Sequence, residues 1–574
     1  MAAMKPGKAK LPAKPAAQTF ALRAWHVAAG TALAVVVALQ AYGPALNGPF
    51  VFDDQYLPFY SYDFAEKPLR TVISGVRPLL MLSFWVNYRM SRLEPYTYHL
   101  FNLLFHAACA VLVFFIARKV LAMAQPTDQG RRELLAAFAA GVFLLHPVQT
   151  ESVAYVASRS ETLSVLFFLG AFALFLYRRE PAISWPAALS ITLLYGAAAS
   201  TKEHTVVLPA LMVATDWLWG GRRAIARNWR LYSLLALLGA AGLWFVWKVL
   251  ASAQTAGFGM RDLPWHHYFF TQWRALWVYV RLFVLPAGQN VDWAYPISRT
   301  PFEHGALFGL AGLVAAAGAA FYFRRRYPLA WYGTIVALIL FAPTSSVVPI
   351  RDAVAERRLY LPFIGLLFVV LEFARRTKAS RGVAAAVMGG LLLALAIATH
   401  QRARVWSSEV ALWEDSVAKS PSNARAHFHL AVAYYVERRC QDALRHFAEA
   451  ARLGKPDASL LADWGLAEDC AGNPQAALAK LEQAARLEPT AHIYTQIGMI
   501  HGKLGRREEA LRALEQAEKL DPRYDMTYFY RGHVYAVAGE LEKAAQEYRK
   551  AVELNPHNEA ARAALLRLGP LAPR

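Results

Sequence analysis

Long apolar runs follow one another along the first 400 residues of the chain and then stop. From about residue 24 to residue 399, runs of roughly 18 to 20 apolar residues recur, which is the length of helix that crosses a hydrocarbon core. After residue 400 the sequence is rich in Ala, Glu, Lys, Arg and Gln, as in solvated amphipathic helices. The pattern predicts an all-α protein with a transmembrane helical bundle over 24–399, followed by a soluble helical region.

Charge asymmetry predicts the orientation of the spans, because Lys and Arg accumulate in cytoplasmic loops. The segment 269–286 carries Arg274 and Arg281 among aromatic residues, which is typical of an interfacial or re-entrant helix. Without it, about eleven crossings place the basic tail 1–23 in the cytoplasm and the C-terminus outside. The candidate segments are 24–43, 99–118, 134–149, 161–177, 183–199, 204–219, 232–250, 269–286, 305–323, 328–344, 359–375 and 382–399.

The N-terminus is basic, and no acidic residue precedes Asp53. A basic segment ahead of an apolar run is also typical of a cleaved signal peptide. A retained first span is favoured, because the apolar run is long and no small-x-small motif ends it. Since a polytopic protein accumulates basic residues in its cytoplasmic loops, the net charge of +20 does not indicate a nucleic-acid partner.

The tail repeats itself with a period near 34 residues. Prolines at 421, 456, 489, 522 and 556 keep this period, and so do alanines at 443, 477, 510 and 544. Two markers in step indicate a tetratricopeptide-repeat (TPR) α-solenoid of about four repeats over 421–566. Residues 400–420, which include RVWSSEVALWEDSV, are predicted to be a linker and capping helix.

Such arrays bind extended peptides in a concave groove, so a protein or peptide partner is expected. Four tyrosines, Tyr434, Tyr494, Tyr528 and Tyr530, either line this groove or pack between helices, and packing is favoured.

The three cysteines are too few for a disulfide framework. Cys109 lies in an apolar run, whereas Cys440 and Cys470 lie in the tail and form a bridge only if the tail faces an oxidising compartment.

Polar residues gather in the loops predicted to lie outside. Asp53 and Asp54 in FVFDDQ provide either a general base or a metal ligand, or else a solvated turn or helix cap. Arg77 in GVRPLL provides a bidentate phosphate ligand or a membrane-surface anchor. Three further loops carry His146, Glu151, Arg159 and Glu161, then Lys202, Glu203 and His204, then Arg351, Asp352, Glu356, Arg357 and Arg358.

Ionisable groups at the membrane boundary either pair with one another or line a polar cavity. Transfer from a lipid-borne phosphate to a hydroxyl needs both kinds of group, a carboxylate for the proton and cations for the leaving phosphate. No P-loop, no HExxH and no Cys/His metal spacing is present in the sequence. Soluble nucleotide chemistry is therefore disfavoured.

Eight stretches, in order, resemble the TMTC family, the transmembrane and tetratricopeptide-repeat-containing O-mannosyltransferases, and their bacterial relatives. These are FVFDDQ, GVRPLL, YHLFNLLFH, HPVQTESVAYVASRSETL, TKEHTVVLP, VLPAGQNVDWAYP, AERRLYLP and RVWSSEVALWEDSV running into PSNARAHFHLA. The resemblance implies a GT-C membrane glycosyltransferase that takes a sugar from a polyprenyl-phosphate donor on the extracytoplasmic side and transfers it to a hydroxyl.

By this resemblance, Asp53 or Asp54 is the acidic residue at the catalytic position, and Asp53 is favoured as the general base. Arg77, Lys202 and Arg357 would bind the donor phosphate. The remaining polar residues expected in the cavity are His146, Glu151, Arg159, Glu203, His204 and Glu356, whereas Arg358 departs from the family pattern. No cofactor is required by the sequence, although Asp53 and Asp54 could hold a divalent cation.

Three functions stay open. The first is transfer of a mannose-like sugar to Ser or Thr hydroxyls of a protein held by the repeats. The second is a GT-C enzyme with an envelope glycan or lipid as acceptor, and the third is a non-catalytic membrane scaffold for a peptide-binding array. The expected location is a bacterial inner membrane with a periplasmic array, and the endoplasmic reticulum stays open as the alternative.

Overall fold

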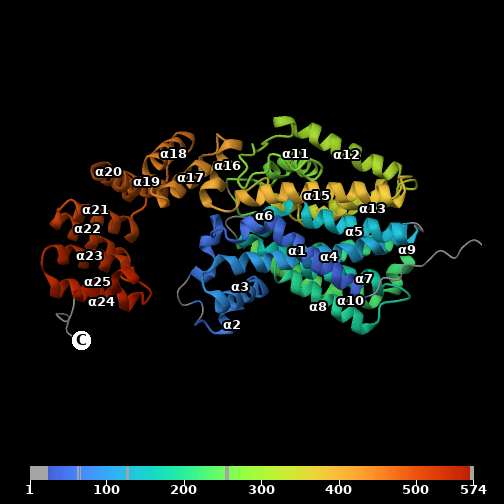
Figure 1. Ribbon diagram of the computed structural model, residues 1–574, viewed down its shortest axis with the longest axis horizontal. Coiled ribbons are helices and arrows are strands. Elements are labelled where there is room, and N and C mark those ends of the chain that lie inside the picture. The colour runs from blue at the N-terminus through green and yellow to red at the C-terminus, as the bar shows by residue number, and fades with distance from the viewer. Residues whose placement is uncertain are drawn as a thin grey trace, which may run out of the picture.

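The computed structural model describes residues 24–60, 64, 66–124, 128–252, 257–260 and 262–568. Within these ranges the chain consists of α-helices and short 3-10 helices with no β-strand, so the all-α prediction is confirmed. Figure 1 shows two parts, a bundle formed by the helices up to α15 and a curved array of helix pairs beyond it. The basic tail 1–23 lies outside the described residues.

The bundle is built around the longest helix, α4, which contacts α1, α5 and α7. Asp128 caps α5 by accepting the backbone N–H of Arg131, and Ser380 caps α15 in the same way. The helices are α1 (Ala24–Leu46), α2 (Leu69–Val72), α3 (Pro78–Ser91), α4 (Pro95–Ala124), α5 (Gln129–Leu145), α6 (Thr150–Ala154), α7 (Arg159–Arg178), α8 (Trp185–Ala199), α9 (Leu208–Arg227), α10 (Trp229–Ser252), α11 (Trp265–Val284), α12 (Ala306–Tyr322), α13 (Pro328–Phe341), α14 (Phe363–Ala374) and α15 (Arg381–Val405).

Helices α13 and α14 pack with their backbones in close contact. A Cβ atom at Gly365 would lie 2.4 Å from the backbone nitrogen of Ala337, and one at Gly333 would lie 2.6 Å from the Gly365 carbonyl oxygen. Since no side chain fits at either position, the two glycines are what permits this pair to approach.

The prediction of about eleven spans is not supported. Within the described ranges, five helices are long and apolar enough to cross a membrane, or six if the pair Gln129–Leu145 and Pro147–Ala154, bent by 49°, counts as one span. The five are Trp25–Leu46, Pro95–Ala124, Val156–Arg178, Glu303–Tyr322 and Arg381–Val405, and the predicted interfacial helix α11 is not among them.

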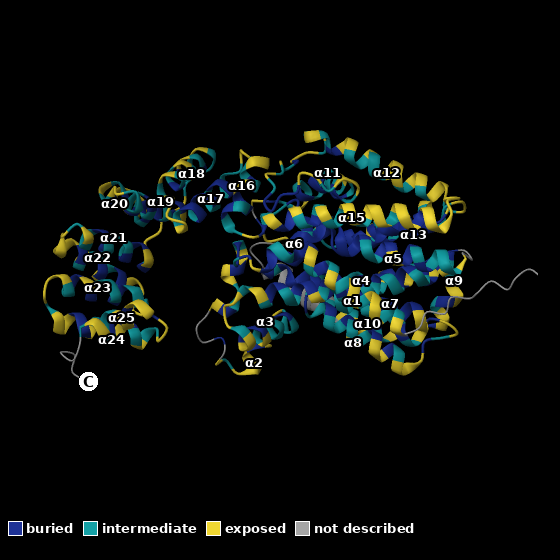
Figure 2. Cartoon of the chain, viewed as in Figure 1, coloured by how far each residue is buried: buried dark blue, intermediate teal, exposed yellow. Residues whose placement is uncertain are grey.

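Two features of the helices explain the lower count. Helices α8, α13 and α14 have only 15, 14 and 12 residues, so at 1.5 Å per residue each rises roughly 18 to 23 Å, less than a hydrocarbon core. The apolar sequence of helix α9 is interrupted by Asp216, which lies fully buried in an ion pair with Arg179. Figure 2 shows long exposed stretches on α12 and α15, as expected of helices that face lipid.

The array continues from the end of α15 as antiparallel helix pairs. The four periodic alanines, Ala443, Ala477, Ala510 and Ala544, are all fully buried. Tyr434 and Tyr528 are buried as well, which supports packing between helices, whereas Tyr494 and Tyr530 are half-buried against the helix cores. The helices are α16 (Glu409–Lys419), α17 (Ala424–Val436), α18 (Cys440–Leu453), α19 (Ala458–Cys470), α20 (Pro474–Leu487), α21 (Ala491–Lys503), α22 (Arg507–Leu520), α23 (Asp525–Val537), α24 (Leu541–Leu554) and α25 (Glu559–Arg567).

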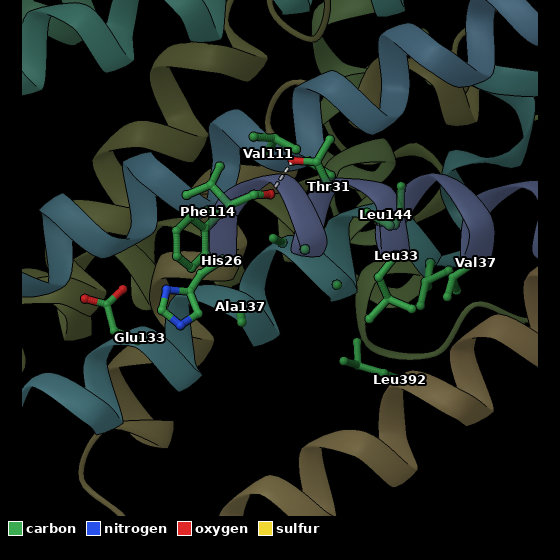
Figure 3. A pocket seen from close by; sticks show the side chains of 17 residues that line it. His26, Thr31, Leu33, Val37, Val111, Phe114, Glu133, Ala137, Leu144 and Leu392 are labelled. Carbon is green, nitrogen blue, oxygen red and sulfur yellow. Dashed lines mark hydrogen bonds between the residues drawn. The ribbon is translucent and has the colours of Figure 1, made fainter. Parts of the chain in front are cut away.

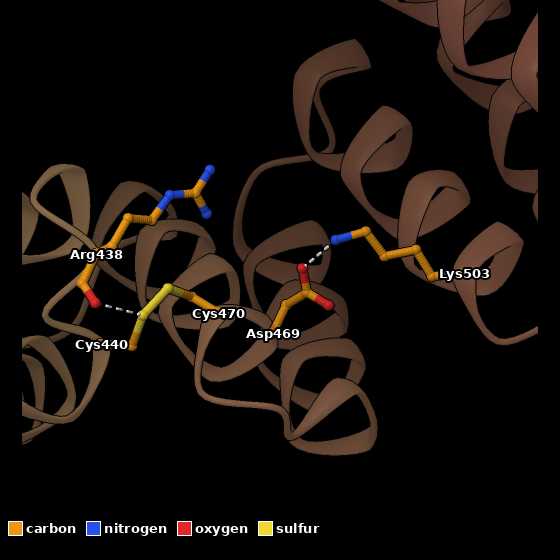
Figure 4. Close-up of a disulfide and its surroundings, with 5 residues drawn as sticks. All are labelled: Arg438, Cys440, Asp469, Cys470 and Lys503. Atoms are coloured by element: carbon orange, nitrogen blue, oxygen red, sulfur yellow. Dashed lines mark hydrogen bonds and ion pairs between the residues drawn. A yellow bond between two sulfur atoms is a disulfide. The ribbon is translucent and has the colours of Figure 1, made fainter.

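Two cysteines of the array form a disulfide. Cys440 begins α18 and Cys470 ends α19, and their Cα atoms lie 5.8 Å apart, within the ordinary range for a bridge (Figure 4). Cys109 is buried and free in α4. The bond therefore ties the first repeat to the second.

Candidate functional site

A polar cavity of about 640 Å³ lies where the bundle meets the array. Two segments of the bundle line it, the 3-10 helix Phe52–Tyr56 after α1 and residues 350–357, which run into the 3-10 helix Glu356–Leu359. Three array helices, α16, α17 and α19, complete the lining. We call it the junction cavity. Its lining residues are Phe52, Asp53, Gln55, Tyr56, Ile350, Arg351, Asp352, Arg357, Glu409, Trp413, Arg425, Phe428, His429, Val432, Ser459 and Asp463.

Asp53 lies exposed at the wall of this cavity, and its place is fixed through the backbone. Its N–H donates to the hydroxyl oxygen of Tyr155 at 3.0 Å, and the ring of Tyr155 lies 6.0 Å from the Arg357 guanidinium. Asp53 and Arg357 thus meet around one tyrosine, although 304 positions (357 − 53) separate them in the sequence. The Asp53 side chain is also hydrogen-bonded to Tyr155, and it remains exposed to the cavity.

Asp54 points the other way, into the protein. Its carboxylate is fully buried and accepts the backbone N–H groups of Val51 and Ala157 at 3.1 and 2.7 Å. Burial raises the pKa of Asp54 to about 8 despite these hydrogen bonds. In this position Asp54 joins the loop after α1 to the segment before α7, while its neighbour faces the cavity.

Arg357 enters the cavity between two carboxylates. Its Nη1 lies 2.5 Å from the buried carboxylate of Glu151 on α6, and its backbone N–H donates to the same side chain at 3.0 Å. Its Nη2 lies 3.7 Å from Asp352 Oδ2, beyond hydrogen-bond distance. The predicted phosphate ligand is therefore hydrogen-bonded to Glu151 at one edge, and at the other edge it is ion-paired with Asp352 at 3.7 Å without a hydrogen bond.

The array contributes Arg425 to the same cavity, at the start of α17. Its Nε donates to Asp292 at 2.7 Å, and its Nη2 donates both to Asp292 and to Asp352, at 2.9 Å in the second case. Beside it, the ring of His429 stacks on Trp413 with centroids 4.5 Å apart. Burial and the charge of Arg425 lower the pKa of His429 to about 4, so this imidazole is neutral at pH 7.

A second ionic group lies within the bundle, and none of its residues lines the junction cavity. Arg77 donates to both oxygens of Glu203 at 2.9 and 2.8 Å, Lys202 pairs with Glu161, and His204 Nε2 lies 3.4 Å from Glu161. Burial lowers the pKa of Lys202, and the charges of Arg77 and Arg357 lower it further against the opposing effect of Glu161. The three cations predicted to bind phosphate are thus close enough to act on one another electrostatically.

Three other predicted site residues have structural partners. Arg159 is fully buried and donates to Asn102, Tyr98 and Ser83, while the His146 ring bonds the backbone of Val148 and Phe283. Glu356 is buried and accepts from Gln289 and from the backbone N–H of Asn290 at 2.8 and 2.5 Å. None of the three lines the junction cavity. In the described ranges, no three His, Cys, Asp or Glu side chains gather as a metal site would require.

Sequence reasoning missed five residues of the site: Tyr155, Asp292, Trp413, Arg425 and His429. Each lies within one of the stretches that carry the family resemblance, which was the signal that could have found them. Arg425 and His429 had been assigned to the repeat array alone. Asp292 had not been distinguished from the other residues of its loop.

A second cavity, of about 460 Å³, is apolar and lies among α1, α4, α5 and α15 (Figure 3). His26 and Glu133 lie together at one end, and Glu133 is already paired with Arg118 at 2.8 Å. The other lining side chains are small or aliphatic apart from Phe114 and Thr31. Because Glu133 is paired and the rest of the lining is largely apolar, the junction cavity is the better candidate for a functional site.

Comparisons with known proteins fit this arrangement. The tetratricopeptide-repeat family model matches residues 410–458 and 495–559. The chain is similar to protein O-mannosyl-transferase F38B6.6 of Caenorhabditis elegans, at 24% identity over 73% of this chain and 62% of that protein. Human TMTC4 is 27% identical over 69% of this chain and 62% of its own length, and mouse TMTC3 is 28% identical over 74% and 51%.

The chain therefore spans 51 to 62% of the length of these three relatives. Its curated homologues are TMTC-family protein O-mannosyl-transferases, as the eight stretches predicted. Among solved structures, the crystal structure of YrrB, a TPR protein with an unusual peptide-binding site, is 24% identical with a TM-score of 0.24, covering 31% of this chain and 88% of that one.

Proposed function

We propose that this homologue of the TMTC protein O-mannosyl-transferases is an integral-membrane GT-C glycosyltransferase. It transfers a mannose-like sugar from a polyprenyl-phosphate donor to Ser or Thr hydroxyls of a protein on the extracytoplasmic face. The observation that carries this proposal is the junction cavity, because one space of about 640 Å³ brings together Asp53, Arg357 and side chains of the repeat array. A scaffold without chemistry has no evident need for an exposed carboxylate and a partly buried arginine in one cavity.

In the proposed reaction, Asp53 is the general base. The acceptor hydroxyl oxygen attacks the anomeric carbon of the donor while Asp53 takes the hydroxyl proton, and the bond from the anomeric carbon to the phosphate oxygen breaks. A single displacement of this kind inverts the anomeric configuration. The exposed position of Asp53 supports the role, whereas the carboxylate of Asp54 is occupied by backbone amides.

The leaving phosphate would be bound by Arg357, with Lys202 and Arg77 contributing positive charge. Arg357 lines the cavity, and its Nη2 edge faces Asp352 at 3.7 Å without a hydrogen bond, so a phosphate oxygen could bind there. Lys202 and Arg77 are each paired with a carboxylate, so they would act on the phosphate mainly through long-range electrostatic attraction rather than by direct contact. Cations placed where charge develops favour the transition state more than the ground state.

The acceptor would reach Asp53 along the array. Phe428 and Val432 on α17, and Ser459 and Asp463 on α19, line the same cavity as Asp53. A peptide held against these two helices would pass the proposed base. The disulfide between Cys440 and Cys470 supports an extracytoplasmic array, because such bonds persist in oxidising compartments. This favours a periplasmic array on a bacterial inner membrane, and an odd number of spans, such as the five counted above, would then place the N-terminus in the cytoplasm.

The test uses the full chain, purified and placed in lipid nanodiscs, with undecaprenyl-phosphate mannose and a Ser/Thr-containing peptide. The wild type should consume the donor and add one hexose to the peptide, and Asp53→Asn should not. Donor consumption at the wild-type rate by Asp53→Asn would overturn the assigned chemistry. If donor is consumed only with an envelope glycan or lipid extract, the acceptor class is wrong and the donor chemistry stands.

A further inference from the structure

We propose that Arg425 of the repeat array is a positioning residue that draws Asp352 away from Arg357. By holding Asp352 at 2.9 Å, it keeps that carboxylate beyond hydrogen-bond distance of Arg357 Nη2, where the donor phosphate would bind. The inference rests on the proposed function, since it takes Arg357 as the phosphate ligand. It assigns to the array a role in donor binding as well as in holding the acceptor.

Asp352 lies between two arginines that come from different parts of the protein. Its Oδ1 accepts a hydrogen bond of 2.9 Å from Arg425 in α17, while its Oδ2 lies 3.7 Å from Arg357 Nη2. Burial raises the pKa of Asp352, but the charge and hydrogen bond of Arg425, followed by Arg357, lower it below its ordinary value overall. The carboxylate is therefore ionised and is hydrogen-bonded to only one of its two arginine neighbours.

Without Arg425, the nearest cation to Asp352 would be Arg357. The attraction between two opposite unit charges grows as the distance between them decreases. Because the Asp352 side chain is only about a quarter exposed, water screens its attraction to Arg357 only in part. A full Asp352–Arg357 pair would use the Nη2 edge, since Nη1 is already bound to Glu151. A phosphate would then have to displace a carboxylate from Arg357 before it could bind.

Arg425 is anchored well enough to prevent this. Its Nε and Nη2 both donate to the buried carboxylate of Asp292, so the guanidinium keeps its orientation while it reaches Asp352. Three further links join the array to the loop 285–296: Asn290 to Ser420 at 2.9 Å, Lys419 to the Gln289 carbonyl at 2.7 Å, and Asn423 to the Asp292 carbonyl at 3.2 Å. Removal of Arg425 alone therefore leaves the array docked.

A rescue experiment separates this role from simple docking. The variants are Arg425→Ala, Asp352→Asn and the double variant, with Arg439→Ala as a matched control, because Arg439 pairs with Asp442 at the array surface. The readouts are KM and kcat for undecaprenyl-phosphate mannose and the Kd for undecaprenyl phosphate, all with the full chain in nanodiscs. Limited proteolysis checks that the array stays docked.

We expect Arg425→Ala to raise the donor KM and the Kd roughly tenfold, with kcat changed much less, because binding in the ground and transition states is weakened alike. The double variant should return both constants to within about threefold of the wild type, since the Asp352→Asn change removes the competing charge. Arg439→Ala should leave them unchanged. Arg425→Lys should fall between the two, since it keeps the charge but not the fork.

A double variant as weak as Arg425→Ala, or weaker, would overturn the inference, because a residue that only docks the array gains nothing from loss of its second partner. The two proposals fail separately. If the wild type binds undecaprenyl phosphate but transfers no sugar, the proposed function fails, and the Kd series still tests Arg425. If the wild type does not bind undecaprenyl phosphate, both are wrong.

Discussion

Asp53 and Asp54 are adjacent in the chain, yet their carboxylates face opposite environments. The Asp54 side chain is fully buried and accepts two backbone N–H groups, whereas Asp53 is exposed at the wall of the junction cavity. The 3-10 helix Phe52–Tyr56 produces this divergence, because consecutive residues of a helix project in different directions. A pair that looks equivalent in sequence thus divides into one residue available for chemistry and one that holds the loop.

Replacement of Asp53 by Asn should abolish transfer with little effect on the fold. Loss of a general base costs roughly 10²- to 10⁴-fold in rate, and an exposed Asp-to-Asn change is almost neutral for stability. The measurement is kcat for sugar transfer beside the thermal midpoint of the same preparation. Glu66→Gln, which neutralises another exposed carboxylate of the loop between α1 and α2, is the matched control and should retain full activity.

Replacement of Asp54 should change how stability depends on pH. The folded-state pKa of about 8 is above the unfolded value of about 3.9, so the folded protein binds the extra proton between these pH values. Stability from this group is therefore fully present below pH ~4 and is lost as the pH rises through about 8, at up to ~1.4 kcal/mol per pH unit.

Asp54→Asn should flatten that slope between about pH 5 and 8, and Asp53→Asn should not. Thermal midpoints of the full chain across this range provide the measurement. An unchanged slope in Asp54→Asn would mean that the carboxylate is ionised throughout and is stabilised by its two backbone hydrogen bonds.

The repeat array could be predicted from sequence because its signal is local. Each buried alanine, from Ala443 to Ala544, packs within its own helix pair, so a period of about 34 residues carries the information. The number of spans could not be predicted in this way, because hydropathy does not reveal where a helix ends. Helix α14, for example, stops after 12 residues, at Arg375 and Arg376, which pair with its own Glu372.

The candidate site was predictable only in part, because local sequence patterns do not reveal contacts between residues that are distant in the chain. Asp53 and Arg357 could be singled out from charge beside apolar sequence and from the family resemblance. Arg425 could not, because its partners Asp292 and Asp352 lie 133 and 73 residues away and only the folded chain brings them together. Conversely, Arg159 was expected to line the cavity from its sequence context, but in the structure it is fully buried and does not line the junction cavity.

Arg159 should prove to be a residue of stability rather than of catalysis. Its guanidinium donates to Asn102 Oδ1 and to the Tyr98 carbonyl at 2.9 Å each, and it stacks on Phe84 at 4.6 Å. Lysine cannot reproduce these fixed donors, so Arg159→Lys should cost about 2 kcal/mol. The expected result is a lower thermal midpoint with unchanged kcat per folded molecule.

Arg178→Lys at the exposed end of the same helix should change neither quantity. A large fall in kcat for Arg159→Lys without a fall in the midpoint would instead give Arg159 a direct part in the reaction.

The disulfide of the array offers a test of both stability and compartment. Cys440 and Cys470 close a loop over a sequence separation of 30, and a bridge of that length stabilises a fold by about 3 to 4 kcal/mol. Cys440→Ser with Cys470→Ser should therefore make α18 and α19 more susceptible to protease while the bundle resists as before.

Mass spectrometry of protein purified from membranes with alkylating agent and no reductant should recover the two cysteines as one cross-linked peptide pair and Cys109 as a free thiol. Alkylation of Cys440 and Cys470 under these conditions would show that the array is held reduced, and would remove the support that the bridge gives to an extracytoplasmic location.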